Sequence, residues 1–596
     1  MTSRERTQVV EVTSSTASEI VQIWLERIEA ALAARDVSAI EALFTPDATW
    51  RDQLAFQWDF KNWLGARDVA AALSELAGNG PSGFRLRQGT SPQLLGEGDQ
   101  AQVVAFYDFE TSVGACGGVV QLTSDGTSVA AAHLLTQLDA IAGHEWRVGA
   151  RRPEGRGHGA VVSRPDPAGV REQSVGFEDR EPQVVVVGAG HNGLMIAARL
   201  ERLGIDTLVL DRHERVGDNW RQRYASLALH NYTSVNDFAY MPFPESFPHF
   251  LSRDVLADFM EYYARAMELK VWNGSFVESA AYDDDTQTWS VDVRRADGST
   301  RVLHPGHLVM AIGLNGLPVV PEVPGADQFQ GDYVHSERFG GGQDHVGKKV
   351  LVVGGGVSAH DVAQDLYEHG VDVTLLQRSS SYVVDVDTFH TYFYAAYMQG
   401  GPVELADTMT QLVPLGVLRA SGALEQLTEV MAEADKAILD DLQAAGFALN
   451  FGPDGKGMVE AHFNGKNGYY FDIGCSRLIA DGKLPFRTGV TIERFTPRGV
   501  VLTDGSELEA DLVVAATGYG STLDAARPVV GDEAADRVGS VWRWGDDREI
   551  TGSARKTGQP GLWFMTGTIV DARVLSKFLA LQILGVELGL NSKELT

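Results

Sequence analysis

The sequence predicts an α/β protein in which two doubly wound units follow a smaller α+β domain. Two apolar runs of strand length, Val184–Val187 and Val350–Val353, each lead into a glycine-rich turn and then into a helical pattern. Both runs suit strands that are covered on both faces of a parallel sheet. Residues 15–150 instead place helical patterns ahead of alternating stretches, which is the order expected of an α+β unit.

The first glycine turn has the spacing of a dinucleotide site. It contains Gly188, Gly190 and Gly193 in the pattern GxGxxG. The first glycine makes the tight turn, the second lets the backbone approach a pyrophosphate, and the third lets helix and strand pack closely. Asp211 ends the next strand 21 residues after Gly190, where a carboxylate reaches a ribose hydroxyl, and Arg212 follows it. An ordinary glycine turn in a doubly wound sheet is the alternative.

Two later stretches are assigned to the same site. Asn219 and Trp220 follow a further glycine turn with Arg221 behind them, and an aromatic residue and an arginine there can pack on the rings of a bound dinucleotide and neutralise its phosphates. Without that context they are equally good surface residues. The apolar strand 511–516 ends in Thr517 and Gly518, and we expect it to close the first domain beside the strand 307–312.

The second glycine turn predicts a different nucleotide. Gly354, Gly356 and Ser358 repeat the strand-turn-helix pattern. At 21 residues after Gly356, where the first unit has its carboxylate, stands the run Gln377–Ser379. Because no acid repels a 2′-phosphate there and Arg378 can pair with one, NADPH is the expected coenzyme, with NADH tolerated. A solvated arginine at a strand end is the alternative. Two such units imply one resident nucleotide and one that visits and donates hydride.

Composition excludes several classes of function. The chain has 596 residues, enough for about three or four domains, and its formal charge of −30 argues against a nucleic-acid partner. Cys116 and Cys475 lie too far apart for a CxxC pair. The N-terminus lacks the apolar run of a signal peptide, and charges interrupt the apolar stretch 562–590. We expect a cytoplasmic protein without a membrane span, and no residue is assigned to a metal.

A separate small domain is expected over residues 15–150, behind a polar tail, residues 1–14. Helical spacing of Ile20, Trp24 and Ile28 precedes the motif LFTPDATWRD and the alternating stretches. This order and motif resemble the cone-shaped fold of nuclear transport factor two and the SnoaL-type cyclases. The resemblance implies that Asp52 and His133 could act as acid and base. A cone used only for packing or dimerisation is the favoured alternative, and a homodimer stays open.

The rest of the chain divides around the second turn. Residues 151–182 are rich in Gly, Pro and charged residues and indicate a linker. A first nucleotide-binding domain is expected from 183–325 and 483–596. The second is expected from 326–482, with a helical insertion at about 382–470.

Two features outside the glycine turns carry structural expectations. Apolar residues at helical spacing in the insertion indicate one amphipathic helix near the substrate entrance: Leu424, Leu427, Met431, Ile438 and Leu442. In the last helix, Arg573 and Lys577 are expected to reach phosphates or solvent, while Phe578 and Leu579 pack it against the protein.

The ordered motifs resemble those of the flavin-containing monooxygenases, within the class B flavoprotein monooxygenases. Between the two turns, the family signature FxGxxxHxxx followed by an aromatic residue is matched by Phe329, Gly331, His335 and Phe339. Gly340 replaces the residue that usually follows, and the ATGY strand end is matched at 516–519. The resemblance covers residues 183 to about 590. With the cone-like extension it is nearest to the type II branch, for which Baeyer–Villiger oxidation of ketones is described.

This resemblance implies FAD at the first turn and NADPH at the second. In the family NADPH reduces FAD, and a flavin C4a-(hydro)peroxide inserts one oxygen atom into a ketone or transfers it to sulfur or nitrogen. Asn231 lies where family members place an asparagine beside the flavin, and its amide could donate to the peroxide. A loop asparagine that satisfies backbone groups is the alternative. His335 is grouped with Asn231 as catalytic because it orders the loop over the nicotinamide, without carrying a proton.

Small molecules are the expected partners: a ketone, sulfide or amine, together with dioxygen. A disulfide reductase needs a cysteine pair near the flavin, which the sequence lacks. A flavin-holding redox sensor or interaction protein, which oxidises NADPH without oxygenating a substrate, is the alternative that stays open.

Overall fold

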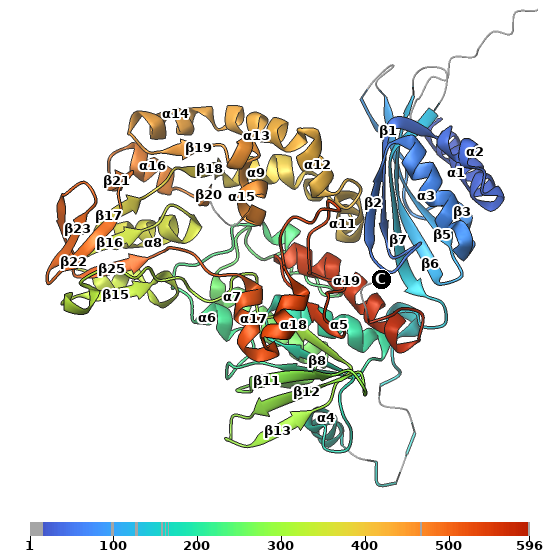
Figure 1. The fold of residues 1–596 in the computed structure, drawn as a ribbon, viewed down its shortest axis with the longest axis horizontal. Coiled ribbons are helices and arrows are strands. Elements are labelled where there is room, and N and C mark those ends of the chain that lie inside the picture. The colour runs from blue at the N-terminus through green and yellow to red at the C-terminus, as the bar shows by residue number, and fades with distance from the viewer. Residues whose placement is uncertain are drawn as a thin grey trace, which may run out of the picture.

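The computed structural model describes residues 16–96, 101–124, 129–155, 159–160, 162–164, 166–464 and 468–593. The polar tail expected at residues 1–14 lies outside the described residues. Figure 1 shows an N-terminal domain beside two α/β units, with a helical insertion along one side of the second unit. The mixed α/β architecture with two parallel sheets is the predicted one.

The N-terminal domain is one sheet with helices on one face (Figure 1). Its strands pair in the order β2-β1-β7-β6-β5-β3, with β4 on β5. They are β1 Phe44–Gln53, β2 Phe60–Leu64, β3 Ser82–Leu86, β4 Gln93–Leu95, β5 Gln102–Glu110, β6 Gly114–Ser124 and β7 Val129–Ile141, with helices α1 Ala17–Ala34, α2 Val37–Glu41 and α3 Ala66–Leu76. Helix α1 was predicted, whereas α3 interrupts the expected order of helices before strands. Gly65, at φ 85°, lets the chain leave β2 for α3, whose Val69 and Leu73 are buried.

Side-chain alternation separates the two candidate acid–base residues of this domain. Thr49 of β1 pairs with His133 of β7, and Asp52 pairs with Thr136. Because successive side chains of a strand point to opposite faces, Asp52 faces the helices and His133 faces the other way. Asp52 is fully buried and accepts a hydrogen bond from Thr136 Oγ1 (2.6 Å), and burial raises its pKa to about 7. The two residues therefore do not form an acid–base pair.

The first parallel sheet has the order β10-β9-β8-β14-β26. Its strands are β8 Val184–Val187, β9 Thr207–Leu210, β10 Val271–Trp272, β14 His307–Met310 and β26 Leu562–Phe564. Helix α5 (His191–Leu203) packs against the long helix α19 (Ile569–Glu587), in which Phe578 and Leu579 are buried as predicted. Around this sheet lie α4 Pro167–Gly176 in the expected linker, α6 Asp218–Arg221, α7 Arg253–Ala266, α17 Thr522–Val530, α18 Asp532–Val538 and the antiparallel strands β11 Phe276–Asp283, β12 Thr288–Arg294 and β13 Thr300–Leu303.

The second parallel sheet has the order β15-β25-β16-β17-β21. Its elements are β15 Asp332–His335, β16 Lys349–Val353, β17 Asp372–Gln377, β21 Phe486–Thr488, β25 Leu512–Ala515 and helices α8 Val357–Glu368 and α16 Cys475–Ala480, with a hairpin sheet of β22 Ile492–Thr496, β23 Gly499–Leu502 and β24 Glu507–Glu509. Strand β25 pairs with β15 and β16, so the expectation that it closes the first domain is wrong. Strand β26 closes that sheet instead. Both are short apolar runs, and periodicity alone does not assign such runs to a sheet.

The helical insertion is built on a small sheet of order β19-β18-β20. Its elements are β18 Ser381–Asp385, α9 Val386–Phe393, α10 Ala395–Met398, α11 Val403–Thr410, α12 Leu415–Ser421, α13 Ala423–Ala434, α14 Lys436–Ala444, β19 Leu449–Asn450, α15 Gly457–Asn464 and β20 Tyr469–Asp472. The single amphipathic helix predicted here is two helices that meet at Asp435. The Asp435 carboxylate accepts hydrogen bonds from Asp385 N (2.7 Å) and Thr388 Oγ1 (2.5 Å), which holds the break against β18.

The two cations of α19 bind carboxylates within the protein. Arg573 is buried and pairs with Asp407 of the insertion at 2.6 Å. Lys577 pairs with Asp139 of the N-terminal domain at 2.5 Å. The expectation that these cations reach phosphates or solvent is therefore wrong, because a nearer carboxylate holds each of them.

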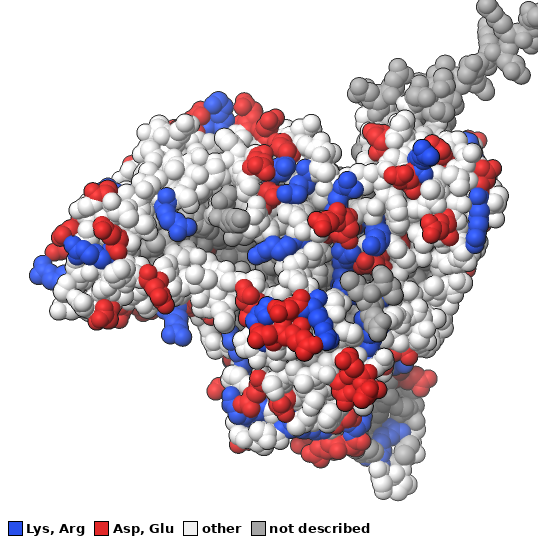
Figure 2. All heavy atoms as spheres, in the orientation of Figure 1, with Lys and Arg blue, Asp and Glu red and all other residues white. Residues whose placement is uncertain are grey.

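None of the helices in the described ranges is long and apolar enough to cross a membrane. On the face drawn in Figure 2, basic and acidic side chains are interspersed in small groups. Within the described part of the chain, no cluster of three or more His, Cys, Asp or Glu side chains could hold a metal ion. Cys116 and Cys475 are both free and buried, one in the N-terminal domain and one in α16.

Candidate nucleotide sites and substrate chamber

The first glycine turn joins β8 to α5 with almost no space for side chains. Gly188 has φ 106°, in the left-handed region, and a Cβ there would overlap the carbonyl oxygen of Ala311. A Cβ on Gly193 would overlap the carbonyl oxygen of Gly188. Gly190, the N-cap residue of α5, is open: the nearest atom to a Cβ there is Asn219 Nδ2 at 3.7 Å. The first and third glycines therefore serve the fold, and the second leaves room at the helix N-terminus, which favours an anion.

The other residues assigned to this site surround the turn. The buried Asp211 carboxylate accepts hydrogen bonds from Ala189 N (2.6 Å) and His213 N (2.8 Å), so it is held against the glycine turn. Asn219 and Arg212 are exposed, and Trp220 is half-buried. The structure thus brings Asp211 to the turn, as the spacing predicted, and places Asn219 beside Gly190.

The second glycine turn repeats this arrangement in the second sheet. Gly354 lies between β16 and α8, and a Cβ there would overlap the carbonyl oxygen of Ala516. Gly356 is the N-cap residue of α8, and a Cβ there would have Tyr469 O as its nearest atom, at 3.7 Å. Ser358 lies in the first turn of α8. This helix N-terminus is therefore also open to an anion.

The end of β17 shows why no carboxylate stands beside the second turn. Gln377 is fully buried, and its amide bonds Ala448 N (3.0 Å), Ala448 O (2.8 Å) and Thr488 Oγ1 (2.8 Å), so it ties the insertion to the sheet. Arg378 is exposed and makes no ion pair with any carboxylate of the described chain. Ser379 O lies 3.8 Å from a Cβ built on Gly355, which places Ser379 beside the turn.

Thr517 and Gly518 follow β25 and contact the segment after β14. We call this contact, made by residues 318–319, 335 and 517–519, the joint between the two sheets. Thr517 Oγ1 donates to Val319 O (2.5 Å), and Gly518 O accepts from His335 Nε2 (3.0 Å). His335 Nδ1 accepts from Glu337 N (3.2 Å), so both ring nitrogens are engaged. Burial lowers the pKa of His335, which keeps the ring neutral. His335 positions this joint, and its place over a nicotinamide stays a prediction.

Unpartnered polar atoms test whether these turns fit a nucleotide. Buried side-chain polar atoms in proteins are almost always hydrogen-bonded. Buried atoms without a partner are spread over the described chain, and six of them lie on residues at or near the two turns and the joint: His191 Nδ1, Asn192 Oδ1, Trp220 Nε1, Arg223 Nε, His360 Nε2 and Tyr519 OH. Donors and acceptors of this kind suit a phosphorylated, ring-bearing cofactor, so the residues present fit a nucleotide at each turn.

A large chamber adjoins the first turn. Its volume is about 550 Å³. The loop before α19 connects its wall to the turn. His191 Nε2 and Asn192 Nδ2 each lie 3.0 Å from Gly567 O, and the next turn of chain brings Thr568 and Asp571 into the chamber wall. Most of the remaining wall is aromatic or aliphatic: Phe389, Phe393, Tyr397, Leu415, Phe463 and Trp542.

Asn231 lines this chamber beside two buried groups that ionise. Its amide Nδ2 donates to Tyr394 OH (3.3 Å), and Asp571 and Tyr394 line the same chamber. The Asp571 carboxylate accepts from Thr568 N (2.8 Å) and Thr568 Oγ1 (2.7 Å), which forms the capping box of α19. Burial raises the pKa of both Asp571 and Tyr394.

Of the chamber's titratable side chains, the buried Arg51 and Glu549 pair with each other and His462 is neutral, whereas Arg548 is exposed. Arg51 Nη2 lies 2.6 Å from Glu549 Oε2, and both side chains are buried. His462 accepts a hydrogen bond from Trp542 Nε1 (3.0 Å), and burial lowers its pKa to about 4, so the ring is neutral at pH 7. A substrate without a net charge suits such a wall, because a buried charge needs a partner.

Several residues of this site were missed by sequence reasoning. The capping box of Thr568 and Asp571 has a readable signal, the pattern T-x-x-D before an apolar run. Arg51, Phe60 and Gln121 of the N-terminal domain also line the chamber. Nothing in their local sequence predicts that, since the contact depends on how distant domains pack.

Comparison with known proteins places the chain among monooxygenases. A family model described as pyridine nucleotide-disulphide oxidoreductase matches residues 185–392. Indole-3-pyruvate monooxygenase YUCCA1 of Oryza sativa subsp. japonica is 32% identical over 355 residues, which cover 59% of this chain and 80% of that protein. The probable indole-3-pyruvate monooxygenase YUCCA8 of Arabidopsis thaliana is 30% identical, over 57% of this chain and 75% of that protein.

Solved structures share the fold. A mutant cyclohexanone monooxygenase from Rhodococcus sp. Phi1 bound to NADP+ matches with a TM-score of 0.51 at 16% identity, covering 68% of this chain and 86% of that one. The complex of OTEMO with FAD and NADP matches with a TM-score of 0.50 at 18% identity, covering 69% of this chain and 86% of that one. At these identities the likeness supports the arrangement of two nucleotide-binding units and carries no further conclusion.

Proposed function

The chain belongs to the flavin-containing monooxygenases, and from this premise we propose that it uses FAD and NADPH to oxygenate a small, uncharged organic substrate. FAD is assigned to the first turn and NADPH to the second, with NADH accepted. The reaction we favour is Baeyer–Villiger oxidation of a ketone, with oxygenation of a sulfide or amine at the same site. The enzyme is proposed to act in the cytoplasm.

The observation that carries this proposal is the position of the chamber. It adjoins the first turn through the contacts of His191 and Asn192 with Gly567, so a flavin at that turn has a substrate-sized space beside it. At about 550 Å³ the chamber suits a small molecule. When bound, reduced flavin supplies the activation of dioxygen.

The chain's own residues would bind and orient the two nucleotides and exclude water from the chamber. The backbone N–H groups at Gly190 and Gly356 would hold the two pyrophosphates, and the Asp211 carboxylate would accept a hydrogen bond from a ribose hydroxyl. Arg378, which is exposed, would pair with the 2′-phosphate of NADPH. Asn231, in the chamber wall, would offer its amide as a hydrogen-bond donor to the reacting oxygen. The aromatic walls keep water from the reaction.

The chamber favours a ketone or thioether over a keto acid. The relatives named for indole-3-pyruvate act on a carboxylate, but Arg51, the buried cation of this chamber, is already paired with Glu549 and donates to Gln411 O (3.0 Å). Arg548, which also lines the chamber, is exposed. A substrate carboxylate bound away from Arg548 would therefore be buried without a partner.

Product analysis tests the proposal. The FAD-loaded enzyme is incubated with NADPH, ¹⁸O₂ and one cyclic ketone or one thioether, and the masses of the products are measured by mass spectrometry. We expect one ¹⁸O atom in a lactone or sulfoxide, and none with the Gly190→Ala variant, which should not retain FAD. NADPH oxidation that neither substrate accelerates, with no labelled product, would favour the redox-sensing alternative.

A further inference from the structure

One wall of the chamber comes from the N-terminal domain. Arg51, Phe60 and Gln121 lie on the sheet face that points away from the domain's own helices, and all three line the chamber. Along β1 the neighbours of Arg51 point the other way: Trp50 and Asp52 both bond Thr136 Oγ1 on the helix-covered face. The sheet thus presents one face to its own core and the other to the substrate.

The domain is fixed in this position by buried contacts. Arg51 forms two hydrogen bonds with Glu549 (2.8 and 2.6 Å), and the two side chains are only 9% and 4% exposed. Arg555 pairs with Asp59 at 2.9 Å, and the arginine side chain is only 11% exposed. An apolar seam joins the same sheet face to the insertion: Val104, Phe106, Val119 and Leu135 pack with Leu405, Met409 and Leu412.

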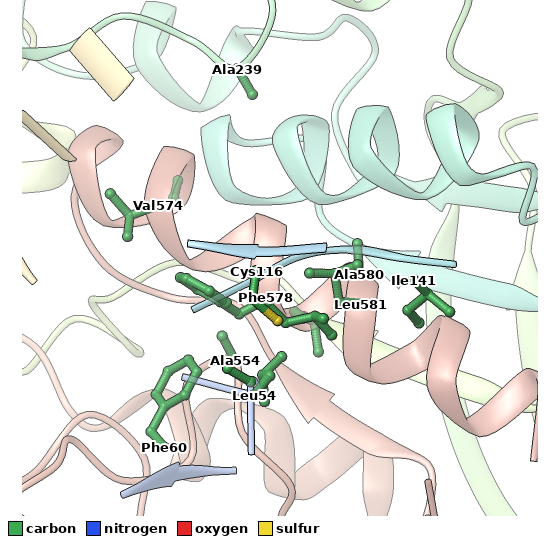
Figure 3. Packing of buried hydrophobic residues seen from close by; sticks show 14 of the residues in the cluster. Leu54, Phe60, Cys116, Ile141, Ala239, Ala554, Val574, Phe578, Ala580 and Leu581 are labelled. Carbon is green, nitrogen blue, oxygen red and sulfur yellow. The ribbon is translucent and has the colours of Figure 1, made fainter. Parts of the chain in front are cut away.

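Phe60 lines the chamber next to α19 and belongs to a different apolar cluster from this seam. It is 3% exposed and stands edge-on to Phe578 of α19, with ring centroids 5.4 Å apart. Figure 3 shows Phe60 beside Ala554, in one cluster with Phe578 and residues of both parts of the chain. A ring at this point of the wall occupies volume that a substrate would otherwise fill.

We propose that the N-terminal domain is the outer wall of the substrate chamber and that Phe60 sets the size of substrate admitted. This inference rests on the proposed function, because it assigns the chamber to the substrate. Gln121, whose Nε2 donates to Gln102 Oε1 (2.6 Å), keeps that wall polar and uncharged. The domain therefore shapes specificity without supplying an acid or base.

The test changes one ring and leaves an equivalent ring as control. Phe60→Leu removes volume from the wall. Phe84→Leu makes the same change in β3 of the same domain, where Phe84 is 7% exposed, stacks on Phe109 at 4.7 Å and does not line the chamber. Binding of cyclic ketones of increasing ring size to the FAD-loaded full-length enzyme, without NADPH, is measured by calorimetry.

Phe60→Leu should shift the affinity ratio of large to small ketone by about tenfold in favour of the large one, as expected for one or two methylene volumes. Phe60→Trp should shift it the opposite way, and Phe84→Leu should leave it unchanged. The proposal is overturned by an equal shift in Phe60→Leu and Phe84→Leu, by no shift in Phe60→Leu, or by no binding of any ketone to the wild type. Because binding is measured without turnover, ketones that bind but give no product would refute the proposed reaction and leave the wall assignment standing.

Discussion

The open glycine of each turn separates folding from cofactor binding. Gly190 has φ −73° and ψ 177°, which any residue adopts, and a Cβ there approaches nothing closer than 3.7 Å. Gly190→Ala should therefore fold normally. The added methyl group nevertheless stands at the helix N-terminus where the backbone must approach the pyrophosphate. Its cost should appear only when FAD binds.

The size of that cost follows from the bonds the methyl group disturbs. Hydrogen bonds from backbone N–H groups to a charged phosphate contribute about 1.5–3 kcal/mol each. Loss of two weaker bonds, or of one strong bond, corresponds to about 3 kcal/mol, or a Kd for FAD raised by about 10²-fold. Gly190→Ala should be purified colourless, with the thermal midpoint of its apoprotein close to that of the wild-type apoprotein.

Two further variants make this prediction specific. A Cβ on Gly193 would overlap a backbone oxygen, which cannot move aside, so Gly193→Ala should lower the midpoint of the apoprotein itself. Gly356→Ala is the counterpart in the second turn, with 3.7 Å to its nearest atom. It should retain FAD and raise the KM for NADPH.

Fluorescence titration of the apoproteins with FAD, and NADPH kinetics of the loaded proteins, measure both effects. Wild-type FAD affinity in Gly190→Ala would refute the assignment of the first turn. Loss of FAD from Gly356→Ala with NADPH kinetics unchanged would reverse the two assignments.

Three other predictions concern charge. Arg378→Ala should raise the KM for NADPH far more than that for NADH in steady-state assays, and equal effects would refute the phosphate contact. Asp52 has a native pKa of about 7, above its unfolded value of about 3.9. Its protonated form therefore stabilises the fold fully below about pH 4, and that contribution is lost as the pH rises through 7. The thermal midpoint of Asp52→Asn should therefore exceed that of the wild type by more at pH 8 than at pH 5. A difference that does not change with pH would contradict the interpretation of Asp52 as a buried acid. Arg51→Met alone should lower the free energy of unfolding in urea by about 3–5 kcal/mol, because it leaves Glu549 buried and unpaired. The double variant with Glu549→Leu should recover most of that loss. Additive losses would show that the pair is not coupled.

The nucleotide-binding part was largely predictable because its signals are local. A glycine that must turn, a carboxylate 21 residues later and a helix behind them all lie within one βαβ unit, so spacing alone brought Gly188, Gly190 and Asp211 together. The same logic identified Gly354 and Gly356. What spacing could not show is that Gln377 fills the carboxylate position for a structural reason, since its partner Ala448 lies 71 residues away.

Assignments that needed long-range pairing failed. Strands β25 and β26 are both short and apolar. Only the strands to which they are hydrogen-bonded show which sheet each one joins. The helix expected through Asp435 is two helices that meet there, where the Asp435 carboxylate accepts hydrogen bonds from Asp385 N and Thr388 Oγ1, long-range contacts that helical periodicity does not report. Arg573 and Lys577 likewise found carboxylates in the insertion and the N-terminal domain.

The substrate chamber depends on this same long-range packing, which ties specificity to stability. Arg51 and Glu549 are 498 residues apart in sequence, yet their pair seals the wall to which Phe60 belongs. A substitution that loosens the domain seam must therefore also change the chamber, even when it lies far from the flavin turn. Conversely, the alternation along β1 lets the outer face vary with the substrate while Trp50 and Asp52 keep the inner core intact. Such a wall can change the substrates admitted without touching either nucleotide site.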